Sequence, residues 1–494
     1  MLRKITFNLK NSKILKYIAK SLDKLRKIFI VLFLIIGYAG ISVFYLTRCN
    51  DNNDTCRKFK NVLYPAQVFD KAIWEVVKLI RIKQISGEFL TTGLISKEDT
   101  RKRFKNLDAG FNFYYSPGER PNAGFLLLSR GLPNKNGLPS IEIWDLNKQK
   151  LVNSYNIDLS KIRKEVNEYL GNFTRFIHPV LLEDGSIITT VVGGVDPLIK
   201  LDKCGAYLDH TKINGIDFHH SLEIDEIGRI YAPIKIRNSE LISKDGYAIL
   251  DQDLNLIKKY SLDNIFKNNL IANDLVQMNS HLNDVQPVQR NDGTFINLLS
   301  LRDQSRVIAF DPNTNEIIWI LDNAFSKQHD VDILNKKSDS LDISIFDNNQ
   351  YKFIRDINFE NNLEKIINNR IVFFKDLPLF KNNELINLTT KTEHEKYNYD
   401  FIDFKFLKNE YIPRTDTQGL SDFVKANNSL MIEETNNGHL FEIDLNDNQL
   451  LWQYINKEKG DNKITYQLSW SRRLNKLPNN LDVSIFKYCE KQNF

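Results

Sequence analysis

The sequence predicts an all-β chain folded as a six-bladed β-propeller, preceded by a single transmembrane helix and a short helical segment. Three observations lead to this prediction: an uncharged apolar segment near the N-terminus, a helical spacing of apolar residues after it, and a loose repeat of short strands over the rest of the chain. The chain has 494 residues, enough for one large domain or for two or three modest ones.

The predicted membrane anchor is residues 28–47. Residues 28–46 read IFIVLFLIIGYAGISVFYL and carry no charge, which is close to the roughly 20 residues that cross the hydrocarbon core as a helix. Residues 1–27 hold nine Lys or Arg residues and one acid, Asp23. Because basic flanks stay in the cytoplasm, we expect a single-pass protein of the inner (cytoplasmic) membrane, with a cytoplasmic tail and everything after Arg48 outside. A cleaved signal peptide is the alternative, but its apolar region is usually shorter and no small-residue cleavage site follows here.

Residues 48–122 are interpreted as a linker and helical preface. The segment NVLYPAQVFDKAIWEVVKLIRIKQ places apolar residues at helical spacing, which predicts a helix after the anchor. These residues are Phe69, Ala72, Ile73, Val76, Val77 and Ile80.

Residues 123–494 carry the repeat that predicts the propeller. In each unit an apolar-alternating strand ends at an aspartate, a polar turn follows, and a second strand often bears an aromatic residue. The six marker aspartates are Asp145, Asp202, Asp251, Asp311, Asp403 and Asp444. Turns of Asp-Gly or related type join two further strands ahead of most markers, as in LLEDGSIITTVVG and QRNDGTFINLLS.

Most intervals between the markers suit a four-stranded blade of roughly 40–50 residues. The longest interval contains a polar, Asn-rich segment around 349–396, which we interpret as an insertion. Six such units predict six blades, and their evenness favours a propeller over the competing array of β-sandwiches.

Charge and cysteine content narrow the possible partners. The formal net charge is only +5 and the basic excess lies in residues 1–27, so we expect no nucleic-acid partner. The four cysteines are Cys49, Cys56, Cys204 and Cys489, all on the exported side of the predicted anchor, where disulfides can persist. Cys49 and Cys56 are near neighbours that could pair, and unpaired thiols are the alternative.

Histidines recur just ahead of the predicted blade hairpins. They are His178 in FIHPVLLEDG, His219 and His220 in FHHSLEIDEIG, His281 in SHLNDVQPVQRNDG and His329 in QHDVDI. The innermost strands of a propeller surround its central channel and start at one mouth, so these distant histidines are expected to converge there. His178 and His219 are more readily read as ordinary loop or hydrogen-bonding residues than His220, His281 and His329, whose placement recurs.

Arg302 falls at the end of the strand that follows the His281 turn, where its guanidinium could face a bound anion. A histidine cluster with an arginine and no obvious carboxylate cage suits sulfate or phosphate esters. A metal bound by imidazoles is the second choice. No phosphate-binding loop, GxSxG elbow or HExxH motif is present in the sequence.

At these residues the sequence resembles the bacterial arylsulfotransferases, which move sulfuryl groups between phenols without a nucleotide sulfate donor. The resemblance covers roughly residues 120–475 and is carried by DFHHSLEIDEIG, by SHLNDVQPV with SLRDQSRVIAFD, by QHDVDI with ISIFDNN, and by EETNNGHLFEIDLNDNQLLWQY. It implies a six-bladed propeller and a ping-pong transfer from an aryl sulfate ester to a phenolic acceptor.

The resemblance also implies the roles of the site residues. His329 is the nucleophile that becomes a sulfohistidine, and His220, His281 and Arg302 complete the catalytic set, with His219 as the alternative to His220 and His178 as a further possible member. No cofactor and no metal are implied. Two alternatives remain open at this stage: a membrane-tethered, non-catalytic binding propeller, and a propeller oxidoreductase that uses a quinone or a metal.

Overall fold

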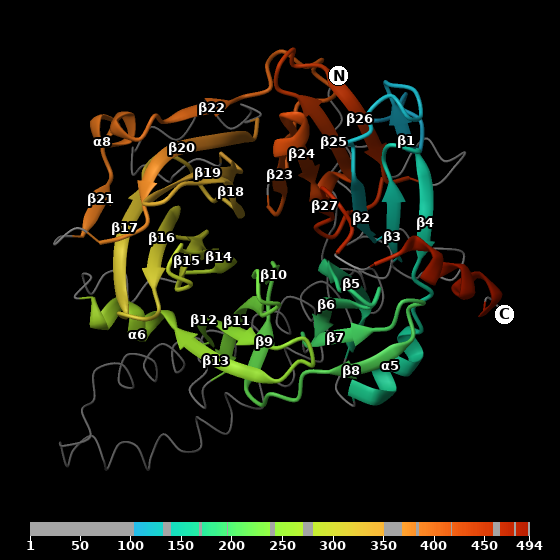
Figure 1. Cartoon of the computed structure of the whole chain (residues 1–494), viewed down its shortest axis with the longest axis horizontal. Helices are drawn as coiled ribbons and strands as arrows, with labels where there is room; N and C mark the ends of the chain where they lie inside the picture. The colour runs from blue at the N-terminus through green and yellow to red at the C-terminus, as the bar shows by residue number, and fades with distance from the viewer. Residues whose placement is uncertain are drawn as a thin grey trace, which may run out of the picture. The chain divides into compact units, whose positions relative to one another are not determined.

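The computed structural model confirms the six-bladed β-propeller (Figure 1). It describes residues 103–131, 140–166, 170–194, 196–237, 243–269, 280–349, 368–381, 385–415, 417–457, 465–478 and 481–492. Among these residues no helix is long and apolar enough to cross a bilayer. The predicted anchor at 28–47, the helix predicted within 61–84, and Cys49 and Cys56 lie outside the described residues.

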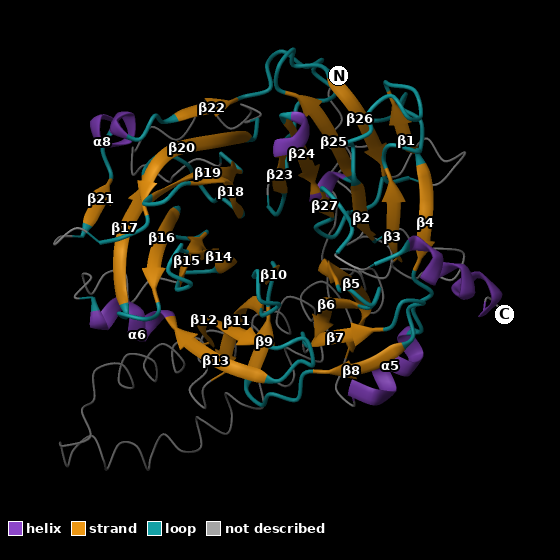
Figure 2. Cartoon of the chain, viewed as in Figure 1, coloured by secondary structure: helices purple, strands orange, loops and turns teal. Residues whose placement is uncertain are grey.

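Six sheets, antiparallel apart from one added outer strand, surround a common centre, and each is one blade (Figure 2). From the centre outwards, blade 1 contains β27 (Arg472–Leu474), β2 (Phe125–Arg130), β3 (Ser140–Asp145) and β4 (Lys150–Ser154). Blade 2 contains β5 (Leu170–Leu181), β6 (Ile187–Gly194), β7 (Leu198–Leu201) and β8 (Tyr207–His210). Blade 3 begins with β9 (Ile216–Phe218) and β10 (Glu223–Ile224), which both pair with β11 (Ile230–Arg237), and continues with β12 (Ser243–Leu250) and β13 (Leu256–Ser261).

The other three blades repeat this order with additions at their outer edges. Blade 4 contains β14 (Leu282–Gln289), β15 (Phe295–Leu301), β16 (Arg306–Asp311) and β17 (Glu316–Asp322), and β21 (Ile386–Leu388) joins it in parallel. Blade 5 contains β18 (Asp330–Lys336), β19 (Ser340–Asp347), β20 (Arg370–Pro378) and β22 (Asp400–Ile402). Blade 6 contains β23 (Leu420–Val424), β24 (Ser429–Glu434), β25 (His439–Asp444) and β26 (Leu450–Ile455), with β1 (Gly110–Phe113) as a fifth strand.

Short helical segments lie between these strands and at the C-terminal end. The α-helices are α5 (Leu159–Val166), α6 (Leu262–Asn268) and α8 (Lys391–Lys396), and the 3₁₀ segments are η2 (Lys425–Asn427), η3 (Thr435–Asn437) and η4 (Val483–Gln492).

The ring closes by exchange of strands between the two ends of the described chain. β27 pairs with β2, so residues near the C-terminus supply the innermost strand of blade 1. β1 pairs with β26, so residues before blade 1 extend blade 6. At the point where the first and last blades meet, β27 thus covers the edge of β2 and β1 covers the edge of β26.

The hydrophobic core is divided among the contacts between neighbouring blades. Each of six buried clusters joins one pair of blades; for example, Trp319 of blade 4 and Phe374 of blade 5 belong to one cluster. Both faces of most blades are therefore covered. This explains why β15 (FINLLSL) is buried along its whole length instead of alternating between buried and exposed residues.

The marker aspartates end the third strand in five blades, where they cap the turn to the fourth strand. The Oδ1 atom of Asp311, for example, accepts the backbone N–H of Asn313 at 2.8 Å, and Asp202 and Asp251 accept two backbone N–H groups each. A short carboxylate suits this role because it replaces the missing backbone acceptor in a tight turn.

Blade 5 departs from the prediction. Asp403 follows the fourth strand, β22, and the third strand is β20. β20 lies inside the segment 349–396 that the sequence suggested to be an insertion, so this segment is not an insertion throughout. Its residues 350–367 and 382–384 lie outside the described residues.

Buried carboxylates of the inner strands tie successive blades together. Each accepts a backbone N–H from the innermost strand of the next blade. The bonds join Asp284 Oδ2 to Val331 N at 3.2 Å, Asp330 Oδ2 to Ser421 N at 2.9 Å, and Asp422 Oδ2 to Arg473 N at 2.8 Å. These bonds fix the height of each inner strand against its neighbour, and with it the position of the residues at the strand's start.

Cys204 and Cys489 form a disulfide, with 5.1 Å between their Cα atoms. It attaches η4 to the turn after β7 in blade 2, where Phe486 packs into the contact between blades 1 and 2. The sequence alone gave no reason to pair these two residues, because they are 285 positions apart.

We expect Cys489→Ser to lower the free energy of unfolding by about 2–5 kcal/mol, because the disulfide limits the unfolded chain. Urea unfolding of the full chain under non-reducing conditions measures this change. Lys487→Ser, at an exposed position of the same segment, is the matched control. Equal unfolding midpoints for the two variants would contradict the expectation.

Candidate active site

Each blade has one non-glycine residue with a positive φ angle just before its innermost strand or at a break within that strand. Around the ring they are Trp470 (φ 59°), His178 (φ 47°), His220 (φ 58°), His281 (φ 48°), Lys327 (φ 58°) and Gln418 (φ 63°). His178 lies within β5, at a break in its pairing between Ile177 and Val180. Such backbone conformations are uncommon for residues with a side chain and gather at functional sites. The recurrence marks one rim of the central channel.

The histidines occupy this rim in two registers. His178, His220 and His281 hold equivalent positions in three successive blades. His329 lies two residues after the positive-φ residue of its blade, Lys327. The repeated placement that the sequence suggested for His329 is therefore approximate, and its ring approaches the others from a different backbone position.

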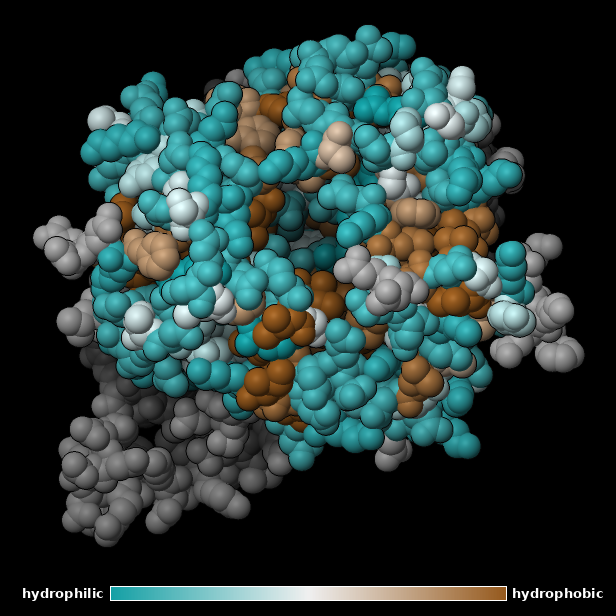
Figure 3. Space-filling model, in the orientation of Figure 1, coloured by the Kyte–Doolittle hydropathy of each residue, from teal (hydrophilic) through white to brown (hydrophobic). Residues whose placement is uncertain are grey.

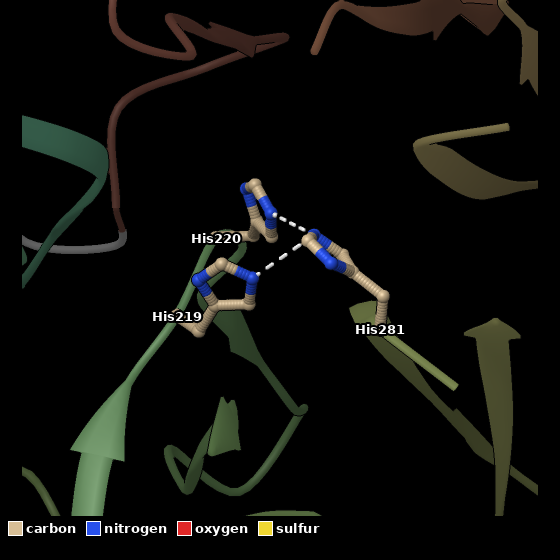
Figure 4. Close-up of side chains that lie close together, drawn as sticks. All are labelled: His219, His220 and His281. Atoms are coloured by element: carbon tan, nitrogen blue, oxygen red, sulfur yellow. Dashed lines mark hydrogen bonds between the residues drawn. The ribbon is translucent and has the colours of Figure 1, made fainter. Parts of the chain in front are cut away.

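Three imidazoles meet directly in this rim (Figure 4). The Nε2 atom of His281 lies 3.2 Å from Nε2 of His219 and 3.1 Å from Nε2 of His220. His281 reaches them from the start of β14, and His219 and His220 lie between β9 and β10. Their spacing also makes them the residues best able to hold a metal ion among those the structure describes.

His329 is held by hydrogen bonds at both ring nitrogens. Asn348 donates through Nδ2 to the carbonyl oxygens of Thr415 at 3.2 Å and Gln418 at 2.9 Å, so its Oδ1 faces His329 Nδ1. This arrangement requires the proton of the neutral ring on Nδ1. The Nε2 lone pair then accepts the backbone N–H of Gln418 at 3.0 Å.

Trp470 packs among the histidines. Its ring is stacked on His220, with centroids 5.5 Å apart, and meets His178 at 5.6 Å and His329 at 6.4 Å edge to face. His220 and His329 are themselves 5.8 Å apart in a T-shaped contact. Trp470 is fully buried, so it fixes the relative orientation of these rings and keeps water from this side of the cluster.

His178 contributes to the contact between blades. Its Nδ1 accepts the backbone N–H of Leu222 at 3.2 Å and lies 3.4 Å from Glu223. Its ring contacts Trp470, which in turn contacts His220 and His329. The geometry therefore gives His178 a structural role and separates it from the converging trio.

Arg302 brings positive charge to the same rim. It lies one residue after β15, and its backbone N–H donates to the carbonyl oxygen of His281 at 3.1 Å. Its Nη1 donates to Asp303 at 2.8 Å, and Lys327 Nζ donates to the same carboxylate oxygen at 3.0 Å. Arg302 Nε is buried and has no hydrogen-bond partner among the described residues, which leaves a donor for an anionic ligand.

Burial keeps the clustered histidines neutral. It lowers the pKa of His329 to about 3, with the charge of Arg302 adding to the effect and the bond to Asn348 opposing it. It lowers the pKa of His281 to about 4, partly offset by Asp303. The pKa values of His219 and His220 are also well below the ordinary histidine value because of burial. Neutral imidazoles have lone pairs that can attack an electrophile or bind a metal.

Several residues of this site were not assigned a role from the sequence. Asn348 was noted only within the FDN motif, and Trp470, Asp303 and the amide of Gln418 were not singled out. The hydrogen bond from the Gln418 amide and the stacking of Trp470 on His220 form only when the ring of blades is closed. Local sequence patterns therefore do not predict them.

The fold and the site together define a six-bladed propeller with a buried, neutral histidine cluster at the start of its inner strands. Residues 178–457 match the family model described as Arylsulfotransferase (ASST), which is more than half of the chain. The chain belongs to this family, whose members are sulfotransferases that act on small-molecule donors and acceptors. No curated protein matches the chain.

Solved structures match the chain at low identity and low TM-score. A protein of unknown function from Bacteroides caccae is 11% identical with a TM-score of 0.42, covering 70% of this chain and 97% of that one. A chain of a nidogen/laminin complex is 9% identical with a TM-score of 0.38, covering 72% and 100%. The dihydro-heme d1 dehydrogenase NirN is 9% identical with a TM-score of 0.33, covering 70% and 56%.

Proposed function

We propose that this protein transfers a sulfuryl group from an aryl sulfate ester to a phenol by a ping-pong mechanism through a sulfohistidine at His329. The observation that carries the proposal is the bonding of His329: its Nδ1 faces an oriented acceptor, Asn348 Oδ1, so its Nε2 carries the lone pair, which accepts the Gln418 N–H. Family membership supports the class of reaction.

In the first half-reaction the Nε2 lone pair of His329 attacks sulfur, leaving its bond to the Gln418 amide. The N–S bond forms, the S–O bond to the aryl group breaks, and the electron pair of that bond leaves on the phenolate oxygen. The ring of His329 gains positive charge as the bond forms, and the Nδ1–H bond to Asn348 stabilises that charge. Covalent catalysis of this kind divides one difficult transfer into two easier ones.

The leaving phenolate takes its proton from His220. Burial keeps His220 neutral in the free site, but an anionic sulfate ester bound beside it opposes this effect and raises its pKa. In the second half-reaction His220 accepts the proton of the incoming phenol, whose oxygen attacks sulfur, and the N–S electron pair returns to His329. One imidazole thus serves as acid and then as base.

The sulfuryl oxygens are held by donors already present at the rim. Arg302 Nε has no hydrogen-bond partner among the described residues. His281 is its neighbour, because its carbonyl oxygen accepts the backbone N–H of Arg302 and its ring is influenced by the arginine charge. Fixed donors in a buried site stabilise developing negative charge more strongly than water does. Figure 3 shows a largely hydrophilic face with a hollow near the centre of the ring of blades.

We further propose that the propeller is anchored at the inner membrane by residues 28–47 and works on its outer side. The Cys204–Cys489 disulfide supports this, since such bonds persist in oxidising compartments. Labelling of single cysteines placed after residue 48, in intact cells with an impermeant reagent, tests this topology.

The proposed activity is tested by incubating the purified full chain with a chromogenic aryl sulfate, with and without a phenol. Release of the chromophore that depends on the phenol, and recovery of the sulfated phenol, support transfer. No turnover would favour the non-catalytic binding propeller. Turnover of a redox substrate only after a metal or quinone is added would favour the oxidoreductase.

The pH dependence of donor turnover follows from the lowered pKa values of His329 and His281. Both groups are neutral well below the ordinary histidine pKa of 6.5, because their pKa values are about 3 and about 4. Since the neutral ring of His329 is the nucleophile, kcat/KM for a donor whose phenolate leaves without a proton from His220 is expected to stay level from about pH 8 to about pH 5 and to fall only at lower pH. An acid limb centred near the ordinary value would contradict this expectation.

A further inference from the structure

The trio of His219, His220 and His281 is more than a set of neighbouring bases. One donor or acceptor atom from each lies within 4.8 Å of the other two, and two of the three Nε2 separations are 3.2 and 3.1 Å. The three rings come from two blades and point their Nε2 atoms toward one another (Figure 4).

Hydrogen bonding does not satisfy this arrangement well. Each neutral Nε2 carries either one proton or one lone pair. His281 Nε2 faces two partners, so it must either share one proton between two lone pairs or offer one lone pair to two protons.

A single metal ion would satisfy all three lone pairs at once. Zn²⁺ binds imidazole nitrogen at about 2.0–2.1 Å in tetrahedral geometry, which separates neighbouring nitrogens by about 3.3–3.4 Å. The two separations from His281 Nε2, 3.2 and 3.1 Å, are within a few tenths of an ångström of this. Three protein ligands with a fourth open position are the pattern of accessible zinc sites.

We propose that His219, His220 and His281 form a binding site for one divalent transition-metal ion, of which Zn²⁺ is the natural probe, through their Nε2 atoms. Asp303 Oδ2 lies 3.8 Å from Nδ1 of His281, where a small approach would make it the outer carboxylate that commonly supports a metal-binding histidine.

The charges around the trio set the character of this site. Lys235 and Arg302 act on both His219 and His281 as positive charges, and Lys327 acts on His281. These cations weaken the binding of a metal ion, and Asp303 offsets them only in part. The site is therefore weaker than a structural zinc site and exchanges its ion with the solvent.

Metal binding has a consequence for transfer that rests on the proposed function. A ligated His220 has no lone pair for the proton of the phenol, and a ligated His281 cannot hold a sulfuryl oxygen through Nε2. Occupancy of the trio is thus expected to inhibit sulfuryl transfer reversibly, with activity restored by a chelator.

The metal site is tested by titrating Co²⁺ into the chelator-treated full chain and recording its visible absorption, then displacing the Co²⁺ with Zn²⁺. The wild-type protein is expected to bind one equivalent with the intense bands of a tetrahedral, nitrogen-rich site. His219→Ala and His281→Ala are expected to weaken binding at least tenfold. His210→Gln, a histidine of β8 outside the trio, is the matched control and is expected to bind as the wild type does.

This readout is independent of catalysis. His329→Asn is expected to bind Co²⁺ normally, because His329 Nε2 faces Gln418 and not the trio, so failure of the sulfotransferase proposal leaves the metal result standing. Absence of a tetrahedral spectrum in the wild type would overturn the site. Unchanged binding by His219→Ala and His281→Ala, each checked for folding by circular dichroism, would overturn it equally.

Discussion

Replacing His329 by asparagine is expected to reduce sulfuryl transfer from a chromogenic aryl sulfate to a phenol by a factor of at least about 10³, because the variant lacks the attacking nitrogen. The asparagine amide can still donate through Nδ2 to Asn348 Oδ1, in the place of the ring Nδ1, and the buried neighbours of the ring remain in place. The loss should therefore appear in kcat, with the protein folded.

The matched control for this variant is His394→Asn. His394 is a buried histidine of α8, and its Nε2 contacts the carbonyl oxygens of Asp322 and Leu388 at the outer edge of the ring. It tests the general cost of removing a buried imidazole. Full transfer activity in His329→Asn, or an equal loss in both variants, would remove His329 from the role of nucleophile.

Asn348→Leu is expected to lower kcat by about 10²–10⁴, because the attacking nitrogen of His329 is available only while the ring proton stays on Nδ1. Leucine is of similar size but accepts no hydrogen bond. Without the Asn348 acceptor, Nδ1 keeps only the 3.2 Å contact with the Lys327 carbonyl oxygen, so the ring places its proton on Nε2 more readily, which removes the lone pair from the reacting position. Asn348 is thus a positioning residue that acts through His329.

Asn349→Gly is the control for Asn348→Leu. Asn349 has a positive φ of 51°, which glycine adopts easily, and its side chain bonds to Asn368 and not to a histidine. A purely structural role for Asn348 would raise KM and lower stability in step with kcat. A selective fall in the rate of the first half-reaction, measured by rapid mixing with donor alone, distinguishes the tautomer effect; a normal rate would refute it.

The number of blades could be read from the sequence because the third strand of most blades ends at an aspartate that caps the next turn. That signal is misleading at Asp403, which caps the turn after the fourth strand of blade 5, β22. The third strand, β20, therefore could not be recognised from it. Ring closure was not readable either. β27 and β1 are only three and four residues long, and neither has periodicity that points to a partner several hundred residues away.

The sequence predicted which residues form the candidate site, but not how their side chains are oriented. The sequence indicated that His220, His281 and His329 would converge with Arg302, and the structure brings the three rings together with the arginine charge beside them. The order of Nδ1 and Nε2 on His329 depends on Asn348, Thr415 and Gln418. That order is set by contacts between blades 5 and 6, which local sequence patterns do not encode.

The central claim is that His329 carries the sulfuryl group between donor and acceptor. Its most direct test is mass spectrometry of the full chain after brief exposure to an aryl sulfate without any phenol, followed by peptide mapping under alkaline conditions. The account predicts an acid-labile mass increase of one sulfuryl group on the peptide that contains His329, which disappears when a phenol is added. Phenol-dependent turnover with no such modification, or with the group on another residue, would contradict it.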